Sequence, residues 1–136
     1  MAFHPIDRDA RDRAERFEHY FSQVPCFYSM TVDLDVTDLK RRGGRFYPAV
    51  LYSLAVIVNR HREFRMAFNE EGVLGWYDQL SPSYTVFHPD TESFSCLWTE
   101  YTPDLSAFLQ RYEEDLRLYG SVESFEAKPH TPPNVF

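Results

Sequence analysis

The sequence predicts an α/β protein in which a mixed β-sheet is covered by helices. Hydrophobic residues recur with helical or strand spacing in the order helix, strand, helix, four strands, helix. Short segments containing Gly or Pro separate the last four strands into pairs, which indicates hairpins and therefore substantial antiparallel pairing. A chain of 136 residues is expected to form a single domain, residues 1–136.

The first helix and strand meet at a proline. Residues 1–12 are charged and are expected to form an arm. Residues 13–23 predict a helix that ends at Pro25. Its aromatic face follows the spacing i, i+3, i+4, i+7 and consists of Phe17, Tyr20, Phe21 and Val24. Residues 26–36 alternate with period 2, which predicts a long strand whose far end has one wet face.

A short helical turn and a longer helix come next. Residues 37–40 predict the turn, capped by Thr37 or its neighbour, and Gly43-Gly44 closes it. The longer helix has Pro48 in its first turn and ends near residues 59–61. Its apolar residues, widened by Val50 and Ile57, predict burial on much of its circumference; they include Leu51, Leu54, Ala55 and Val58.

Two strand pairs and a final helix complete the domain. The first pair is expected at residues 64–69 and 73–77 around Gly72, and the second at residues 84–88 and 94–99 around a turn at 89–92. Asp104 is expected to cap the last helix, and Gly120 to stop it. The proline-rich residues 129–136 are expected to be extended.

Composition excludes several classes of function. The net charge is −7 and no basic stripe is present, which argues against nucleic-acid binding. No apolar run approaches the ~20 residues of a membrane helix, and the charged N-terminus is no signal peptide, so the cytoplasm is expected. Cys26 and Cys96 are the two cysteines, and both are expected to be free, buried thiols. Cysteine and histidine spacing indicates no metal.

Several segments resemble, in order, those of the chloramphenicol acetyltransferases. The first, at residues 17–31, runs from the aromatic helix through a Val-Pro corner into the strand and reads FEHYFSQVPCFYSMT. Further segments are LDVTDLK, RFYPAVLYSLAVIVNRHREFRMAF, NEEGVLGWYDQLSPSYTVFHPDTESFS, LWTEYTPDL and FEAKPHTPPNVF. The likeness covers nearly the whole chain from about Phe17 onward. It is nearer to this family than to the wider fold shared with dihydrolipoamide acyltransferases.

The resemblance implies a fold and a reaction. The fold is that of the CoA-dependent acyltransferases, and the reaction moves an acetyl group from acetyl-CoA, a co-substrate, to the 3-hydroxyl of chloramphenicol, which gives antibiotic resistance. The family forms homotrimers with each active site between two subunits. A histidine in an HHxxxDG motif near the C-terminus acts as general base, and a serine just past PPNVF stabilises the oxyanion.

Neither catalytic part occurs in this sequence. None of His4, His19, His61, His88 and His130 lies in an HHxxxDG pattern, and the sequence ends before the position of the serine. The resemblance therefore implies the N-terminal part of a truncated acetyltransferase domain, with an incomplete fold and no catalytic residue. We expect it to be inactive on its own.

The resemblance also implies substrate-binding residues, carried over by position. The wall of the antibiotic pocket is expected to include His19, Tyr20, Val24, Cys26, Phe94 and Phe125. Arg13 matches a charged residue that holds the structure near the site. These apolar and aromatic residue types suit a flat nitrophenyl ring.

The residues also have interpretations that need no ligand. Tyr20 and Phe94 are typical of core positions, Cys26 of a buried thiol, and His19 of a solvent-facing helix residue. The acidic run Glu113-Glu114-Asp115 is expected to be a solvated helix face rather than a carboxylate pair.

Three functions therefore stay open, one of which is an ordinary acyltransferase of the wider fold that acts on another acceptor. The first is an O-acetyltransferase relative with a partial pocket and a chloramphenicol-like substrate. The alternative is a non-catalytic binding or interaction protein on the same scaffold, which would need a partner for its uncovered apolar faces.

Overall fold

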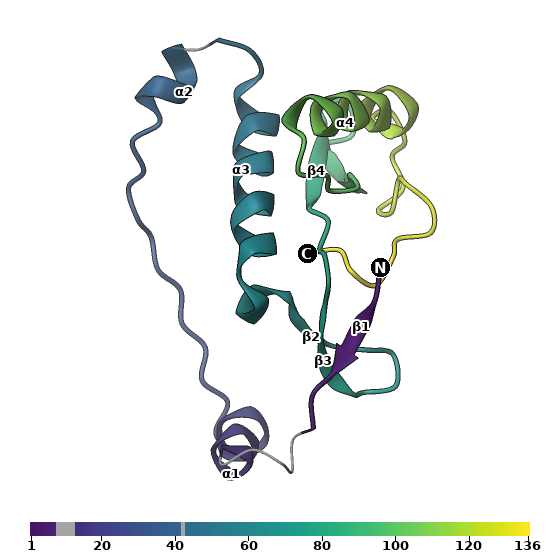
Figure 1. Ribbon diagram of the computed structural model, residues 1–136. Helices are drawn as coiled ribbons and strands as arrows, with labels where there is room; N and C mark the ends of the chain where they lie inside the picture. The colour runs from purple at the N-terminus through teal and green to yellow at the C-terminus, as the bar shows by residue number, and fades with distance from the viewer. Residues whose placement is uncertain (8–12, 42) are drawn as a thin grey trace.

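The computed structural model describes residues 1–7, 13–41 and 43–136 and confirms the α/β class. Figure 1 shows α3 and α4 beside the β4–β5 hairpin, with β1, β2 and β3 grouped at the other end. The elements are β1 (Phe3–Pro5), α1 (Ala14–Glu18), the π-helical turn η1 (His19–Gln23), α2 (Thr37–Arg41), α3 (Phe46–Arg60), the 3₁₀ turn η2 (Arg62–Arg65), β2 (Met66–Phe68), β3 (Leu74–Tyr77), β4 (Ser83–His88), β5 (Ser93–Trp98) and α4 (Leu105–Tyr119). No helix in the described ranges is long and apolar enough to cross a bilayer.

The first sheet has the order β1-β3-β2, with antiparallel pairing throughout. Its hairpin turns at Gly72, whose φ of 74° lies in the left-handed region. The predicted strand at residues 64–69 begins too early, because Phe64 lies in the 3₁₀ turn η2. Arg65 donates from its guanidinium to the carbonyls of Tyr77 and Asp78, which ties this turn to the end of β3.

The prediction of an N-terminal arm is wrong for the residues that the structure describes. Phe3 packs on Tyr77 with ring centroids 5.0 Å apart, and β1 pairs along the edge of β3. A Cβ at Gly75 would lie 2.3 Å from the Phe3 ring, so only glycine allows this approach. The His4 ring bonds to the carboxylate of Asp78, which is the main cause that lowers the pKa of Asp78. The rest of the predicted arm, residues 8–12, lies outside the described residues.

The second sheet is the β4–β5 hairpin. The core lies between this hairpin and the helices that cover it. Strand and turn positions agree with the prediction, and Ser83 pairs with Trp98 at one end and His88 with Ser93 at the other. α4 packs against α3 and β5, and α3 reaches the hairpin through side chains such as Tyr47, whose ring lies edge-on to that of Tyr84. The core consists of Leu51, Tyr84, Leu97, Phe108, Tyr112 and Ala127.

Parallel pairing is confined, among the described residues, to two isolated bridges. Ser81 pairs with Val135, and Cys96 with Glu126. These bridges make the pairing mixed, as predicted, although every named strand is antiparallel to its neighbour. The predicted extended tail contains turns, and it returns beside β4, where the carbonyl of Phe136 accepts from the Ser83 amide at 2.8 Å.

The predicted strand at residues 26–36 is extended but pairs with no described residue. Its side chains lie in solvent, with Phe27 92% exposed. Cys26 is also exposed, so the prediction of a buried thiol there is wrong, whereas Cys96 is half-buried. Both cysteines are free, as predicted. An alternating sequence favours extended backbone locally, but a strand also needs a neighbour for its hydrogen bonds.

The helix boundaries were predicted well because their signals are local. Asp104 caps α4 through a 2.7 Å hydrogen bond from the Ala107 amide, and the helix ends at Tyr119, before Gly120. α3 ends at Arg60, but Leu54 and Ile57 are about half exposed, so it is buried on one side and not on most of its circumference. The turn at α2 is capped by Asp35, whose carboxylate accepts from the Thr37 amide and whose pKa is lowered mainly by its hydrogen bonds to Thr37.

Candidate functional site

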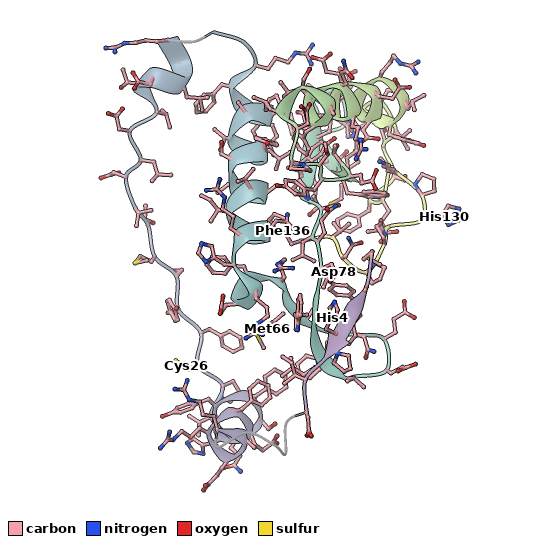
Figure 2. The ribbon with its side chains drawn as sticks, viewed as in Figure 1. His4, Cys26, Met66, Asp78, His130 and Phe136 are labelled. Atoms are coloured by element: carbon pink, nitrogen blue, oxygen red, sulfur yellow. The ribbon has the colours of Figure 1, made fainter. Side chains whose placement is uncertain are left out.

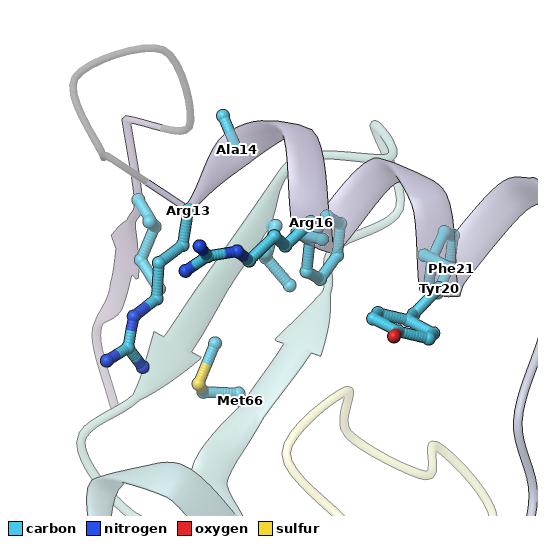
Figure 3. A pocket seen from close by; sticks show the side chains of 9 residues that line it. Arg13, Ala14, Arg16, Tyr20, Phe21 and Met66 are labelled. Carbon is cyan, nitrogen blue, oxygen red and sulfur yellow. The ribbon is translucent and has the colours of Figure 1, made fainter.

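An apolar cavity lies where α1 and η1 cross the first sheet. Its volume is about 480 Å³, within the range typical of small-molecule sites. It is lined by Ile6, Arg13, Ala14, Arg16, Phe17, Tyr20, Phe21, Met66 and Leu74. Figure 3 shows Arg13, Arg16 and Tyr20 on the helical side and Met66 on the strand side. The structure therefore brings together two of the expected site residues, Arg13 and Tyr20.

Aromatic contacts fix the helix over the cavity. Phe17 and Phe21 stack one turn apart with centroids at 5.2 Å, and Phe21 reaches Phe68 of β2 at 5.1 Å. Tyr20 is 61% exposed and Phe21 55% exposed, so the aromatic face is only partly covered. The face that the sequence predicted is thus a cavity wall rather than a sealed core.

Three expected pocket residues lie outside this cavity. His19 is exposed, bonds through Nδ1 to Oε1 of Gln23 at 3.1 Å, and meets the Tyr20 ring edge-on at 5.0 Å. Val24 ends the π turn, since its amide donates to the His19 carbonyl at 2.8 Å. Cys26 lies on the unpaired segment, away from the sheets (Figure 2).

The remaining two expected residues meet on the second sheet and do not line this cavity. Phe94 of β5 and Phe125 lie edge to face with ring centroids 6.0 Å apart, and their side chains are 50% and 64% exposed. The pairing of the 125–127 segment with β5 holds them there: the Cys96 amide donates to the Phe125 carbonyl at 2.6 Å, and the Ala127 amide donates to the Cys96 carbonyl at 3.2 Å. No contact among the described residues joins this pair to Tyr20, so the expected site is divided into two parts.

A buried polar network joins α4 to the segment that follows it, and our sequence analysis did not predict this network. The Asp115 carboxylate accepts from the Lys128 ammonium at 2.7 Å and from the Thr99 hydroxyl at 2.8 Å. Lys128 also donates to the Trp98 carbonyl and lies 3.7 Å from the centroid of its ring. The expectation that the acidic run is a solvated face is therefore wrong for Asp115, which is 7% exposed.

A signal for this burial was present in the sequence. Asp115 follows Phe108 and Tyr112 at the spacing i, i+4, i+7, and these are the buried residues of α4. The partner could not be inferred, because Lys128 belongs to a non-helical segment beyond the helix.

The network extends to a tyrosine at the core. The Tyr84 hydroxyl bonds to the Thr99 hydroxyl at 3.0 Å. Burial is the main cause that raises the pKa of Tyr84 above its ordinary value of 10.0, and the Asp115 charge adds to it. Burial likewise raises the pKa of Tyr112. Both hydroxyls therefore keep their protons at neutral pH.

The site offers binding surfaces without an evident base. His88 is 8% exposed and its Nε2 bonds to the Ser95 hydroxyl at 2.9 Å, so it cannot reach a substrate proton in this arrangement. Within the described ranges, no three His, Cys, Asp or Glu side chains gather where they could hold a metal ion. The geometry of the described residues suits the binding of an apolar, aromatic molecule.

Comparisons with known proteins agree on one family. A family model described as chloramphenicol acetyltransferase matches residues 1–136. A chloramphenicol acetyltransferase from Clostridium perfringens is 53% identical over 136 residues, which are 100% of this chain and 66% of that protein. One from Clostridioides difficile is also 53% identical, over 100% of this chain and 64% of that protein.

A solved structure supports the same fold. It is a chloramphenicol acetyltransferase with a TM-score of 0.75 and 19% sequence identity, and the match covers 98% of this chain and 62% of that one. The chain thus spans just under two thirds of the length of the relatives it matches.

Proposed function

Because the chain belongs to the chloramphenicol acetyltransferase family, we propose that residues 1–136 form the acceptor-binding part of an acetyltransferase domain. The acceptor is a chloramphenicol-like alcohol, the donor is acetyl-CoA, and the biological role is antibiotic resistance. The residues of this chain would bind and orient the antibiotic. The proposal extends to a homotrimer in the cytoplasm, as the family resemblance suggests.

The observation that carries the proposal is the meeting of Phe94 and Phe125. These rings come from β5 and from the segment after α4, and they lie edge to face at the surface with half or more of each side chain exposed. A flat nitrophenyl ring gains most from apolar contact of this kind, because aromatic side chains bury large areas with few polar demands. Arg13 and Tyr20 at the cavity supply the other expected part of the pocket.

The chemistry itself needs groups that these residues do not offer. In acetyl transfer, the hydroxyl oxygen attacks the thioester carbonyl, a base takes the hydroxyl proton, and the CoA thiolate leaves. The resemblance puts the base and the oxyanion donor in regions that residues 1–136 do not include. We therefore propose that the 136-residue chain binds without catalysing transfer.

The catalytic half of the proposal is tested by thiol release. Purified chain is incubated with acetyl-CoA and chloramphenicol, and free CoA is followed, with the Clostridium perfringens relative as the active control. No release above the rate without protein is expected. Measurable release would overturn the proposal and would direct attention to an exposed group such as His19.

The binding half is tested with matched variants. Phe94→Ala is expected to weaken chloramphenicol binding about tenfold, which corresponds to about 1.4 kcal/mol, in isothermal titration calorimetry. Phe64→Ala is the control, because Phe64 is 60% exposed and lies in η2, away from Phe125. Equal binding by both variants would contradict the assignment of Phe94 to the pocket.

The alternative function is a non-catalytic interaction protein on the same scaffold. The exposed apolar residues of the 26–36 segment favour it, since such surface marks a site for a partner. A soluble assembly that forms without binding chloramphenicol would support this alternative instead.

A further inference from the structure

A histidine on β1 makes two side-chain contacts to the end of β3 and the residue after it. The His4 ring stacks on Trp76 with ring centroids 4.1 Å apart and an interplanar angle of 16°. Nε2 of His4 also bonds to Oδ1 of Asp78, and Figure 2 labels both residues near the start of β1. The side chains of His4 and Asp78 are 44% and 47% exposed, so the imidazole can exchange protons with solvent while it makes these contacts.

Two cations approach the same indole ring from η2. The guanidinium groups of Arg62 and Arg65 lie 5.9 and 5.2 Å from the centroid of the Trp76 ring. They would repel a protonated His4, whereas the Asp78 carboxylate touches the imidazole directly. Because Coulomb energy falls with distance, the attraction to Asp78 is expected to exceed this repulsion.

The other charged groups near Asp78 leave this carboxylate ionised. The hydrogen bond from His4 is the main cause that lowers the pKa of Asp78, and the positive charge of the N-terminus adds to it. Glu100 lines a cavity together with Asp78, and its carboxylate is paired with Arg111 at 2.9 Å. An imidazole ordinarily gains its proton between pH 5 and 8, so His4 is the member of the pair that changes charge near neutrality.

The position of β1 decides part of the wall of the α1 cavity. The Ile6 amide donates to the Leu74 carbonyl at 2.9 Å, and both residues line that cavity. At the other end of the strand, the Asp78 amide donates to the Ala2 carbonyl at 3.1 Å. A three-residue strand has few such bonds, so a side-chain contact of modest strength can change how often it opens.

We propose that His4 is a pH-sensitive contact that holds β1 on β3, and with it Ile6 in the wall of the α1 cavity, more firmly when the imidazole is charged. The contact is strongest where both groups are charged. It weakens above about pH 7 as His4 loses its proton, and below about pH 4 as Asp78 gains one. The consequence for ligand affinity rests on the proposed function and adds regulation of the same site.

The first test is NMR-detected amide exchange on the 136-residue chain at pH 6 and pH 8, corrected for intrinsic exchange rates. The amides of Ile6 and Asp78 are expected to open about threefold less often at pH 6. The factor is modest because the ion pair is about half exposed. Amides of α4, at residues 105–119, serve as the internal reference.

Two substitutions test whether the pair causes this difference. His4→Gln keeps a donor for Asp78 but cannot gain a proton, and Asp78→Asn keeps an acceptor without its charge. The threefold ratio between the two pH values is expected to disappear in both variants. Because the ratio is measured within one protein, a general weakening of β1 does not imitate this result. The control is His61→Gln, which should keep the ratio, because His61 is exposed and its ring contact is to Phe64.

The second test measures chloramphenicol binding by calorimetry at the same two pH values. Chloramphenicol has no group that titrates between pH 6 and 8, so a change in its affinity reports on the protein. The affinity is expected to be about threefold higher at pH 6, and this difference should be lost in His4→Gln. His19 meets the Tyr20 ring beside the cavity. Loss of the difference in His19→Gln but not in His4→Gln would therefore overturn the inference.

The outcomes separate this inference from the proposed function. Equal opening of Ile6 at the two pH values, or more frequent opening at pH 6, overturns the inference. A ratio that persists in both His4→Gln and Asp78→Asn overturns it as well. Absence of chloramphenicol binding at either pH counts against the proposed function alone, because exchange at Ile6 needs no ligand and still decides whether His4 holds β1 in place.

Discussion

Asp115 shows how one buried side chain organises its surroundings. Its carboxylate joins Lys128 and Thr99, and through Thr99 it reaches Tyr84, so α4, β4, the residue after β5 and the segment after α4 meet at one point. The side chains of Lys128 and Asp115 are 15% and 10% exposed. A charge so placed is tolerated because its partner and its hydrogen bonds replace water.

Removal of the Lys128 ammonium should destabilise the protein strongly. Lys128→Ala is expected to lower the free energy of unfolding by about 3 kcal/mol, because Asp115 would stay buried without its counter-charge. Urea denaturation followed by circular dichroism measures this change.

Arg117→Ala is the matched control for this prediction. It breaks the exposed pair between Arg117 and Glu114 on the same helix, and pairs of this kind contribute about 0–1 kcal/mol. Equal losses in the two variants would show that the Lys128 pair is no more important than a surface pair.

Tyr84 should make the protein sensitive to alkali. Burial raises its pKa in the folded state above the ordinary value of 10.0, so above pH 10 the folded chain holds a proton that the unfolded chain releases. Stability is therefore expected to fall as pH rises through 10, by at most about 1.4 kcal/mol per pH unit from this one group.

Tyr84→Phe tests that dependence. The variant should lose about 1 kcal/mol at neutral pH, because the Thr99 hydroxyl loses one of its two partners, but its stability should fall less steeply between pH 9 and 11. Some loss of stability with rising pH remains in this variant, because burial also raises the pKa of Tyr112 and Tyr101. Parallel pH profiles for the two proteins would refute the role of Tyr84.

At the scale of elements, prediction succeeded where the signals are local. The Asp104 cap, the Gly72 turn and the β4–β5 turn depend on neighbouring residues, and the structure has each of them. β1 was missed because a three-residue strand has too few positions to show a period, and its place depends on Gly75, which pairs with Pro5 but lies seventy residues further along the sequence. Residues 26–36 have the alternating pattern of a strand. The pattern of one segment cannot show whether a second segment pairs with it.

Limited proteolysis should locate the weakest element. Chymotrypsin is expected to cut first after Phe27 or Tyr28, because the segment is extended and unpaired. Phe27 is 92% exposed and Tyr28 is 90% exposed. Mass spectrometry of the first products identifies the site. A first cut within α4 would contradict the expectation that residues 27–28 are less protected than this helix.

At the scale of the whole molecule, the fold class was predictable and the division of the site was not. Periodicity and turns indicate which elements exist, and the hairpins indicate antiparallel pairs, so the α/β class follows from the sequence. The resemblance identified the expected pocket residues, and it could not show that Tyr20 lines the α1 cavity while Phe94 meets Phe125 elsewhere. Those positions depend on how distant elements pack, which no single segment contains.

The pairing of β1 with β3 anchors the N-terminal residues independently of the extended segment 25–36. The Ala2 amide bonds to Asp78, the Ile6 amide bonds to the Leu74 carbonyl, and the Phe21 ring meets Phe68, so the N-terminal piece is held without help from residues 25–36. That segment is an exposed connection between η1 and α2. Its length could be doubled by insertion at a cost of only about 0.6 kcal/mol in closure entropy, which makes it a natural place to splice in a foreign loop or to open new chain termini.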